Sequence, residues 1–387
     1  MKEKRNHIDI YVFVSVIVLL IFSLAAVYSA SSTFSLAKTN DFSFFFRLHL
    51  IKMIIGLFLF FIAIKIDYHF YKKITKKVLL LAILSLIILF FVGNVIKGAN
   101  RWIGVGLLSF QPSEFAKFAL IFHLAFLLEQ KEEFIHDFNK GFLPLLVWIV
   151  SVTAFVMIQP NFSTGAMIFV ISFIMLFIGK VRIKHILGVA LSLIPLLVVY
   201  AINAEYRLKR ILAFLGSSES VEEVNYQLQQ AIIGFGNGGI FGVGPGQSIQ
   251  RDFFLPESYG DFIFAIIGEE YGFIGAVVII FIFILIMIRG IKIAKHSIDL
   301  FGKYLAVGIT STISVYAIVN TGVACGLFPT TGLPLPFLSY GGSSMIFTAF
   351  ATGVLLNISS HTDIQPRTEN IVEDDIQEEP IVGQIFK

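Results

Sequence analysis

The chain alternates long apolar runs with short polar connections. An α-helix needs about 20 mostly apolar residues to cross the hydrocarbon core of a bilayer, and ten runs approach that length. They are residues 8–28, 49–66, 78–96, 113–128, 142–158, 164–179, 183–202, 262–288, 304–325 and 344–358. The pattern predicts an all-α polytopic membrane protein with about ten transmembrane helices.

Two of the predicted connections differ from the rest. Residues 203–260, between the seventh and eighth runs, form a loop of about 60 residues, and residues 326–343 contain proline and glycine but no charge. Long ordered connections are commonly functional, and irregular backbone survives at membrane depth only where protein or a water-filled cavity covers it. We therefore expect a long outer loop between helices 7 and 8, and a cavity-lining segment near the end of the chain.

Composition and charge agree with a membrane protein. Hydrophobic residues make up 56% of the 387 residues and charged residues only 14%, against about 25% charged in soluble domains. Lysine and arginine lie mainly in alternate connections, about 16 on one side against about eight on the other, which predicts that both termini are cytoplasmic. The formal net charge of +3 gives no reason to expect nucleic acid as a partner.

The chain after residue 360 has a different composition. Residues 361–387 are polar and acidic and contain no apolar run of membrane-spanning length. Such segments bury too little apolar surface to fold. We expect one transmembrane domain over residues 1–360 and a disordered cytoplasmic tail over residues 361–387.

The start of the fourth predicted span carries an acid and a base. Glu114 and Lys117 are three residues apart, so they share one face of the first helical turn. Charged groups at the mouth of a span are costly unless they pair or face a polar cavity, which makes them candidates for a functional site. Arg101, in the connection before them, offers a planar fork that fits a phosphate. The alternative is an interfacial ion pair without a role in binding.

The long loop contains a basic group and a glycine-rich stretch. Arg210 and its basic neighbours could hold an anionic lipid headgroup or a pyrophosphate by charge-assisted hydrogen bonds, or could be an ordinary solvated group. Seven glycines in residues 234–246 allow sharp turns and a close approach to a ligand. They formally match a dinucleotide-binding fingerprint, but no βαβ unit surrounds them, and we reject that function.

Asp261 directly precedes the apolar run 262–288. A carboxylate there has a low-dielectric wall on one side, a setting that suits a general base, although aspartate is also a good helix N-cap. Glu269 and Glu270 are adjacent and point to different faces of one helix, so a structural use with partners is the favoured interpretation. The eight histidines and the single cysteine form no cluster, and no zinc site is expected.

In their order along the chain, these motifs resemble the SEDS family (shape, elongation, division and sporulation), and its FtsW cell-division branch more closely than its RodA elongation branch. The matching segments are Arg101-Trp102 with Gln111-Pro-Ser-Glu114, Gln159-Pro160, Gly242-Val-Gly-Pro-Gly246 with Leu255-Pro-Glu257, Asp261-Phe-Ile-Phe264 with Glu269-Glu270, and Pro334-Leu-Pro-Phe-Leu-Ser-Tyr-Gly-Gly-Ser343. They cover about residues 8–360, nearly the whole chain. Pro329-Thr-Thr-Gly332 would also suit RodA, which keeps that branch as an alternative.

The resemblance implies a ten-span bundle that polymerises peptidoglycan strands from lipid II at the outer face of the bacterial cytoplasmic membrane, at the division septum. Its partners would be a class B penicillin-binding transpeptidase (FtsI-like) and other divisome proteins. The family's essential outer-loop aspartate falls on Asp261. Tyr259-Gly260 stands where His-Thr is usual, and Asn161 where aspartate is usual, so the roles of that histidine and that acid do not carry over.

A polymerase of this class displaces a lipid pyrophosphate from an anomeric carbon by attack of a sugar 4-hydroxyl, with inversion. We expect Asp261 to take the hydroxyl proton. Basic side chains or a divalent cation, Mg or Mn, would offset the charge of the leaving pyrophosphate, and no organic cofactor is needed. The predicted substrate-binding residues are Arg101, Glu114, Lys117, Arg210 and Glu257.

Two functions from other classes fit the same pattern. A lipid II flippase is also a polytopic bundle with intramembrane charge and broken helices, but it needs access from both leaflets, whereas Asp261 and the basic residues Arg101 and Arg210 map to the outer side. A scaffold that only recruits the transpeptidase would tolerate the loss of Asp261. The outer position of the charged residues favours the enzyme.

Overall fold

The computed structural model describes residues 7–92, 94–96, 99–104, 109–202, 222–255 and 258–364, and these are mostly helical. The long helices are α1 (Ile10–Thr39), α2 (Phe44–Lys65), α3 (Tyr68–Val92), α4 (Pro112–Gln130), α5 (Leu143–Ile158), α6 (Phe162–Ile178), α7 (Ile183–Ile202), α9 (Glu222–Gly238), α10 (Ile263–Lys295), α11 (Leu300–Ala324) and α12 (Gly342–Ser359). An antiparallel hairpin, β1 (Asn94–Ile96) and β2 (Ala99–Trp102), follows α3. Short turns of 3₁₀- or π-helix lie at Glu132–Phe134, Phe138–Phe142 and Gln250–Phe254.

A helix lies at each of the ten predicted spans. The bounds of α7 are those predicted, whereas α1 continues to Thr39, well beyond the predicted end at residue 28. Among the described residues, seven helices are long and apolar enough to cross a membrane: α1, α2, α3, α5 with the turn before it, α10, α11 and α12. The prediction of an all-α membrane fold is confirmed.

Both ends of the described chain lie at the same end of the bundle. The Asp9 amide, just before α1, donates to Ser359 Oγ at the end of α12, at 2.9 Å. A chain that starts and ends on one side crosses an even number of times, so the seven apolar helices are not the whole set, and ten crossings stay a prediction. His361 and Thr362 are still buried, so packing continues past residue 360. Residues 365–387, most of the predicted tail, lie outside the described residues.

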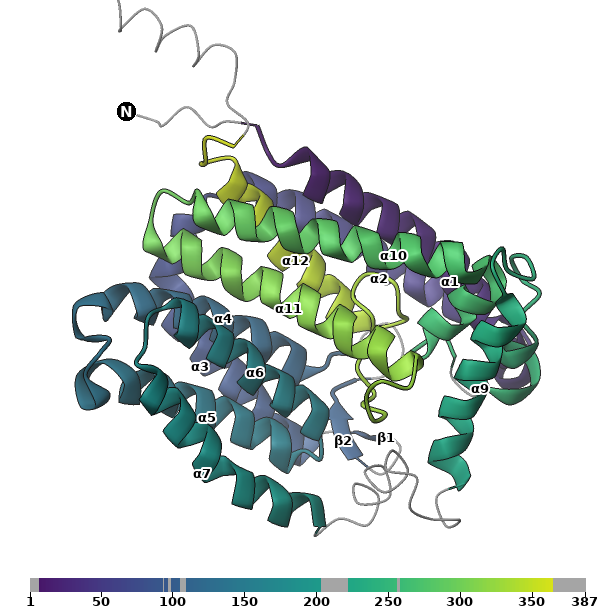
Figure 1. Ribbon diagram of the computed structural model, residues 1–387, viewed down its shortest axis with the longest axis horizontal. Helices are drawn as coiled ribbons and strands as arrows, with labels where there is room; N and C mark the ends of the chain where they lie inside the picture. The colour runs from purple at the N-terminus through teal and green to yellow at the C-terminus, as the bar shows by residue number, and fades with distance from the viewer. Residues whose placement is uncertain are drawn as a thin grey trace, which may run out of the picture.

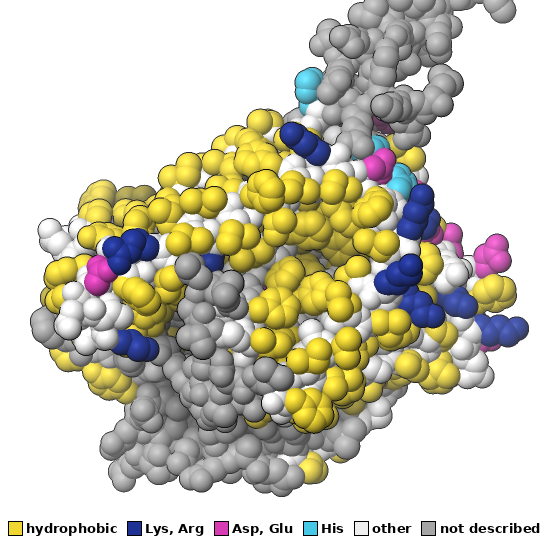
Figure 2. All heavy atoms as spheres, turned by 180° about the vertical axis from the view of Figure 1, so that it is seen from behind, with side chains coloured by type: hydrophobic (Ala, Val, Ile, Leu, Met, Phe, Trp, Pro, Cys, Tyr) yellow, Lys and Arg dark blue, Asp and Glu magenta, His cyan; other side chains and the backbone are white. Residues whose placement is uncertain are grey.

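The surface of the bundle is apolar across its middle. Figure 2 shows a broad hydrophobic band, with most of the charged side chains towards the two ends. Large apolar side chains on the helices are exposed, among them Phe58, Phe91 and Phe281. Exposed apolar patches of this extent would be unstable in water, and they match the hydrocarbon of a bilayer.

The interior is organised around α4 and α11. Nearly every residue of α4 is buried, and α11 packs against α4, α6, α10 and α12. On another side, α2 and α12 approach closely because Gly353 carries no side chain. A Cβ atom on Gly353 would lie 2.4 Å from the Phe60 carbonyl oxygen. Small residues allow this kind of close helix contact in membranes.

One end of the bundle carries most of the irregular structure. Figure 1 shows α9, the β1–β2 hairpin and the segment between α11 and α12 at the same end of the helices. We call this the outer end, following the predicted topology, and the opposite end the inner end. Helix α9 lies within the predicted long loop, and its last turns contain the first three glycines of residues 234–246.

The rest of the glycine-rich segment packs against a break in α10. Gly272 has φ +67° and ψ −167°, which interrupts the helix. The amides of Val243 and Gly244 donate to the carbonyls of Glu269 and Glu270, each at 3.0 Å. A Cβ atom on Gly272 would lie 2.4 Å from a backbone nitrogen of the segment. The close approach that these glycines permit is therefore to the backbone of α10.

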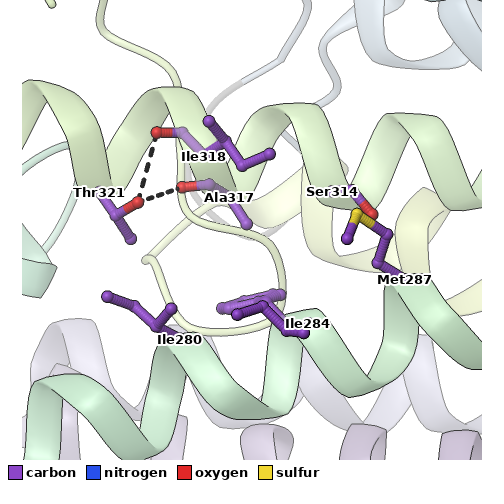
Figure 3. Close-up of a pocket in the computed structure, with 8 residues that line it drawn as sticks. Ile280, Ile284, Met287, Ser314, Ala317, Ile318 and Thr321 are labelled. Atoms are coloured by element: carbon purple, nitrogen blue, oxygen red, sulfur yellow. Dashed lines mark hydrogen bonds between the residues drawn. The ribbon is translucent and has the colours of Figure 1, made fainter.

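A shallow apolar groove of about 60 Å³ runs between α10 and α11 (Figure 3). Ile284 and Met287 of α10 face Ser314 and Ile318 of α11 across it. The Thr321 hydroxyl, at one end, bonds back to carbonyls of its own helix. The lining suits alkyl chains or apolar side chains rather than a sugar, which separates this groove from the polar pocket described below.

Candidate active site

Asp261 lies at the outer end, in the loop that leads into α10. The N-cap position of α10 is Phe262, and no side chain makes a capping hydrogen bond there. Asp261 is therefore not the N-cap residue of this helix, which was the structural alternative for it. The Asp261 side chain is partly buried.

Two segments far apart in the sequence are tied together around Asp261. The side-chain amide of Asn320, in α11, donates from Nδ2 to the main-chain carbonyls of Asp261 and Leu333, at 2.8 Å each. The Gly260 carbonyl accepts a hydrogen bond from Ser339 Oγ at 2.7 Å. The uncharged segment between α11 and α12, which we expected to line a cavity, thus lies beside Asp261.

A small polar pocket of about 30 Å³ opens next to Asp261. Gln227 of α9, Asn320 of α11 and residues 330–333 complete its walls. Gly332 has φ +73°, and a Cβ atom there would lie 3.3 Å from Asp261 Oδ2, so glycine leaves room around the carboxylate. The pocket can hold one or two water-sized groups, such as the hydroxyls of a sugar edge, but not a whole sugar ring.

Glu114 and Lys117 form an ion pair, which is the structural alternative for these two residues. Lys117 Nζ lies 2.7 Å from Glu114 Oε2, and the two side chains are only 2% and 1% exposed. The Lys117 ammonium also lies 4.1 Å from the centre of the Tyr316 ring, a favourable cation–π contact. Tyr316 precedes Asn320 by one turn of α11, a rise of about 6 Å. The pair therefore lies one turn deeper in the bundle than the pocket.

The hairpin residue Arg101 contacts a second predicted motif. Its Nη2 atom donates to the carbonyl of Pro160, in the turn between α5 and α6. The neighbouring Asn161, where the family usually has aspartate, donates from Nδ2 to Ser113 Oγ at 3.4 Å, so this position contributes a neutral group next to the start of α4. The predicted substrate contacts Arg210 and Glu257 lie outside the described residues.

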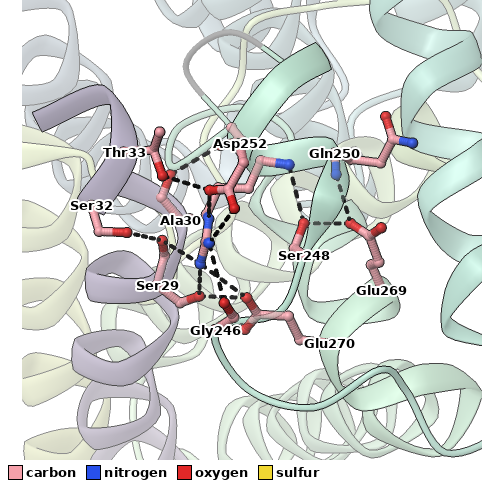
Figure 4. A network of polar contacts seen from close by, with 12 residues as sticks. Ser29, Ala30, Ser32, Thr33, Gly246, Ser248, Gln250, Asp252, Glu269 and Glu270 are labelled. Atoms are coloured by element: carbon pink, nitrogen blue, oxygen red, sulfur yellow. Dashed lines mark hydrogen bonds and ion pairs between the residues drawn. The ribbon is translucent and has the colours of Figure 1, made fainter. Parts of the chain in front are cut away.

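Glu269 and Glu270 belong to a polar network that joins α1, α10 and the turn before α10 (Figure 4). Glu269 accepts a hydrogen bond from Ser248 Oγ. Glu270 accepts one from Ser29 Oγ, and Arg251 Nη1 lies 3.6 Å from its carboxylate. Both carboxylates are buried and satisfied by protein donors. The predicted structural use is confirmed.

Within the part of the chain that the structure describes, no group of three or more His, Cys, Asp or Glu side chains is arranged to hold a metal ion. The divalent cation stays a prediction.

The sequence analysis missed Asn320, Ser339 and Gln227. A signal existed for Asn320, because an amide near the end of an apolar span is costly and is commonly functional. Ser339 lies within the family motif Pro334–Ser343 and gave no signal of its own. Gln227 gave no signal, because its place beside Asp261 depends on how α9 docks on the bundle.

The family model for FtsW, RodA and SpoVE, described as “Cell cycle protein”, matches residues 10–364. This chain belongs to that family. The resemblance to SEDS proteins is thereby confirmed over almost the whole length.

Curated SEDS relatives are similar along most of their lengths. The “Probable peptidoglycan glycosyltransferase FtsW” of Geobacter metallireducens is 39% identical over 362 residues, which cover 93% of this chain and 96% of that protein. “Stage V sporulation protein E” of Bacillus subtilis is 39% identical over 364 residues, 94% and 100% of the two chains. The Haemophilus influenzae protein named as a probable FtsW is 38% identical over 347 residues, 88% of each chain.

Solved SEDS structures share the fold. A chain from “Structural coordination of polymerization and crosslinking by a peptidoglycan synthase complex” superposes with a TM-score of 0.75 at 24% identity, covering 91% of this chain and 97% of that one. Thermus thermophilus RodA superposes with a TM-score of 0.68 at 22% identity, covering 92% and 98%. The FtsW proteins are more similar to this chain in sequence than Thermus thermophilus RodA is. This confirms that the chain lies nearer the FtsW branch of the family.

Proposed function

We propose that this chain is a peptidoglycan glycosyltransferase that polymerises lipid II at the outer face of the bacterial cytoplasmic membrane during cell division. Relatives of nearly the same length, named as probable enzymes of this kind, support the reaction class. The observation that carries the proposal is the position of Asp261, which lies beside a polar pocket at the outer end. Its main chain is held there by Asn320.

The proposed reaction joins two sugars and releases a lipid pyrophosphate. The 4-hydroxyl oxygen of the acceptor attacks the anomeric carbon of the donor and forms the new C–O bond. The bond from that carbon to the pyrophosphate breaks on the opposite face, and the pyrophosphate keeps the electron pair. Asp261 accepts the hydroxyl proton, as a general base. No oxidant or reductant is involved.

The leaving pyrophosphate needs positive charge nearby. Lys117, paired with Glu114 one turn below the pocket, and Arg101, on the hairpin at the same end, are the candidates within the described residues. Arg210 and Glu257 stay predicted contacts. A divalent cation, Mg or Mn, would enter bound to the pyrophosphate as part of the substrate.

We also propose a crosslinking partner, a class B transpeptidase of the FtsI type, at the division septum with other divisome proteins. The fold is shared with a chain of a complex in which polymerisation and crosslinking are coordinated, and this supports a joint assembly. Cytoplasmic termini follow from the charge bias between connections, with support from the contact between Asp9 and Ser359 at one end of the bundle.

The proposal is tested by giving purified protein fluorescent lipid II, with and without a class B transpeptidase, and separating the glycan strands on gels. Asp261→Asn keeps the side-chain shape but cannot take the proton, so we expect at least about a 100-fold loss of rate. Asp137→Asn, in an exposed turn at the inner end, is the matched control and should keep the full rate. Full polymerisation by the Asp261→Asn variant would rule out Asp261 as the general base.

The same protein in vesicles tests the transport alternative. A flippase would move fluorescent lipid II between leaflets and would form no strands. The apolar side chains of Ile309 and Ile313, buried in α11, lie between the pocket and the inner end. We therefore expect strands on the outer side and no transfer between leaflets.

A further inference from the structure

The pocket beside Asp261 contains an asparagine that the proposed mechanism does not yet use. Asn320 is 1% exposed and lies near the outer end of α11. An asparagine side chain offers two N–H donors and one carbonyl acceptor. Both donated bonds are made, to the carbonyls of Asp261 and Leu333. The Asn320 amide thereby fixes the main chain on two sides of the pocket.

The acceptor half of the same amide is not used within the protein. Asn320 Oδ1 is buried and accepts no hydrogen bond from the described residues. A flipped amide would place Oδ1 against the two carbonyl oxygens, which repel it, so the chemistry of the neighbours fixes its orientation. Buried polar atoms without a partner are rare in folded proteins and require an explanation.

The walls of the pocket define which ligand could supply the missing bond. Asp261 Oδ2 and Asn320 Oδ1 are acceptors, while Gln227 and Thr331 in the same lining carry N–H and O–H groups. A ligand that satisfies Asn320 Oδ1 has to donate a hydrogen bond, as a hydroxyl does. Its volume of about 30 Å³ fits one or two hydroxyl groups at the edge of a sugar.

We propose that Asn320 is a binding residue for the acceptor sugar: its Nδ2 group fixes the Asp261 main chain, and its Oδ1 atom accepts a hydrogen bond from a sugar hydroxyl next to the one that reacts. One hydroxyl has only one proton to donate, so the reacting 4-hydroxyl donates to Asp261 and its neighbour donates to Asn320. Two contacts on one edge of the sugar ring set its orientation, and a misplacement of about 1 Å costs about 100-fold in rate. This inference rests on the proposed glycosyltransferase function.

The chain offers a matched control at the inner end. Asn357 in α12 is fully buried, and its Nδ2 donates to the Ile64 carbonyl at 2.8 Å. Its Oδ1 accepts from the Tyr68 amide at 2.8 Å. Asn357 joins two segments as Asn320 does, but its acceptor is already occupied by the protein.

The experiment compares Asn320→Leu, Asn320→Asp and Asn357→Leu in full-length protein, with thermal unfolding measured in detergent and polymerisation measured at varied lipid II. We expect Asn320→Leu to raise KM for lipid II, to lower kcat, and to reduce kcat/KM by about 100-fold. Asn357→Leu should lower the unfolding temperature and leave the kinetics of the folded fraction unchanged. Equal kinetic losses in the two leucine variants, or an Asn320→Leu rate within twofold of wild type, would overturn the inference.

If Asn320→Leu does not fold, the Asn320→Asp variant tests the role of the Asn320 side chain. When the introduced carboxyl group is ionised it cannot donate to the two carbonyls, whereas the protonated acid keeps one donor and one acceptor. The rate of Asn320→Asp relative to wild type should therefore rise as the pH is lowered from about 8 to about 5.5. A ratio that does not change with pH would contradict the role. Wild type without polymerase activity would instead reject the proposed function itself.

Discussion

The outer and inner ends of the bundle use polar groups in different ways. At the inner end, the half-exposed His69 bridges the carboxylates of Asp67 and Asp299, with 2.7 Å to each. Arg289 forms an ion pair with Asp9. At the outer end, Asn320 lines the pocket beside Asp261 and keeps a buried acceptor atom that has no partner among the described residues.

The comparison distinguishes polar groups that stabilise the fold from polar groups that are available to a ligand. A buried polar network stabilises a fold when every member has a partner, and the inner clusters meet that condition with protein groups alone. In the outer pocket, Asn320 Oδ1 is left for another group to satisfy. The Tyr71 hydroxyl, at the inner end, is also buried without a hydrogen bond, so unused bonding capacity indicates a site only where it borders a pocket, as at Asn320.

The largest expected effect comes from breaking the deep ion pair at the outer end. Lys117→Met leaves the Glu114 carboxylate buried without its cation, which should lower the free energy of unfolding by about 3 kcal/mol. Lys72→Met, at the inner end, breaks a partly exposed pair with Glu129 and should cost less than about 1 kcal/mol. Thermal unfolding in detergent measures both.

A double variant separates stability from substrate binding at that pair. Glu114→Gln with Lys117→Met removes both charges and should recover most of the lost stability, because no uncompensated charge stays buried. Its polymerisation rate should stay low if Lys117 stabilises the leaving pyrophosphate. A double variant with full activity would show that the pair is structural, like the polar clusters of the inner end.

A smaller effect is expected from filling the space next to Asp261. Gly332→Ala adds a Cβ atom 3.3 Å from Asp261 Oδ2 and should lower kcat about tenfold by displacing the carboxylate. Gly326→Ala is the control, because Gly326 also has a positive φ, +77°, but its nearest neighbours are apolar side chains. Both variants share the backbone strain, so equal kcat values would argue against crowding of the carboxylate.

The smallest expected effect is the pH dependence of stability, which should have the same sign at the two ends. Burial would raise the pKa of Asp252, but hydrogen bonds from Arg251 and Thr33 outweigh it and lower the pKa. At the inner end, burial likewise opposes the hydrogen bonds from His69 that lower the pKa of Asp67. Each carboxylate therefore adds stability above its ordinary pKa of about 4, and this stability is lost as the pH falls through the lower folded-state pKa.

Asn variants at these two positions provide the measurement. At pH 7, Asp252→Asn should lower the free energy of unfolding by about 1 kcal/mol, and the unfolding curves of variant and wild type should converge below about pH 4. Asp67→Asn should show a smaller difference of the same sign. Curves that stay parallel down to about pH 3 would contradict the assigned causes.

The sequence predicted the helices well because span length and apolarity are local properties. Helix α7 has the predicted bounds, and Asp261 could be selected from its place just before an apolar run. The position of Glu114 and Lys117 on one face of the first turn of α4 followed from helical spacing alone. Each of these inferences needed only a short window of the chain.

Contacts between distant segments could not be predicted in this way. Asn320 reaches Asp261 and Leu333 only because α10, α11 and the segment before α12 meet at one end. The glycine-rich segment suggested a ligand, but its backbone fits against the break at Gly272. Both relations depend on the packing of the bundle, which residue periodicity does not encode.

The break at Gly272 gives α10 two mechanically distinct parts. Before the break, the carbonyls of Glu269 and Glu270 accept hydrogen bonds from the amides of Val243 and Gly244. Just after it, the amides of Phe273 and Ile274 donate to the carbonyls of Gly239 and Ile240. One short segment therefore holds both sides of the break, and a displacement of that segment would bend α10 at Gly272 and shift the proposed base relative to the lipid-embedded part of the helix.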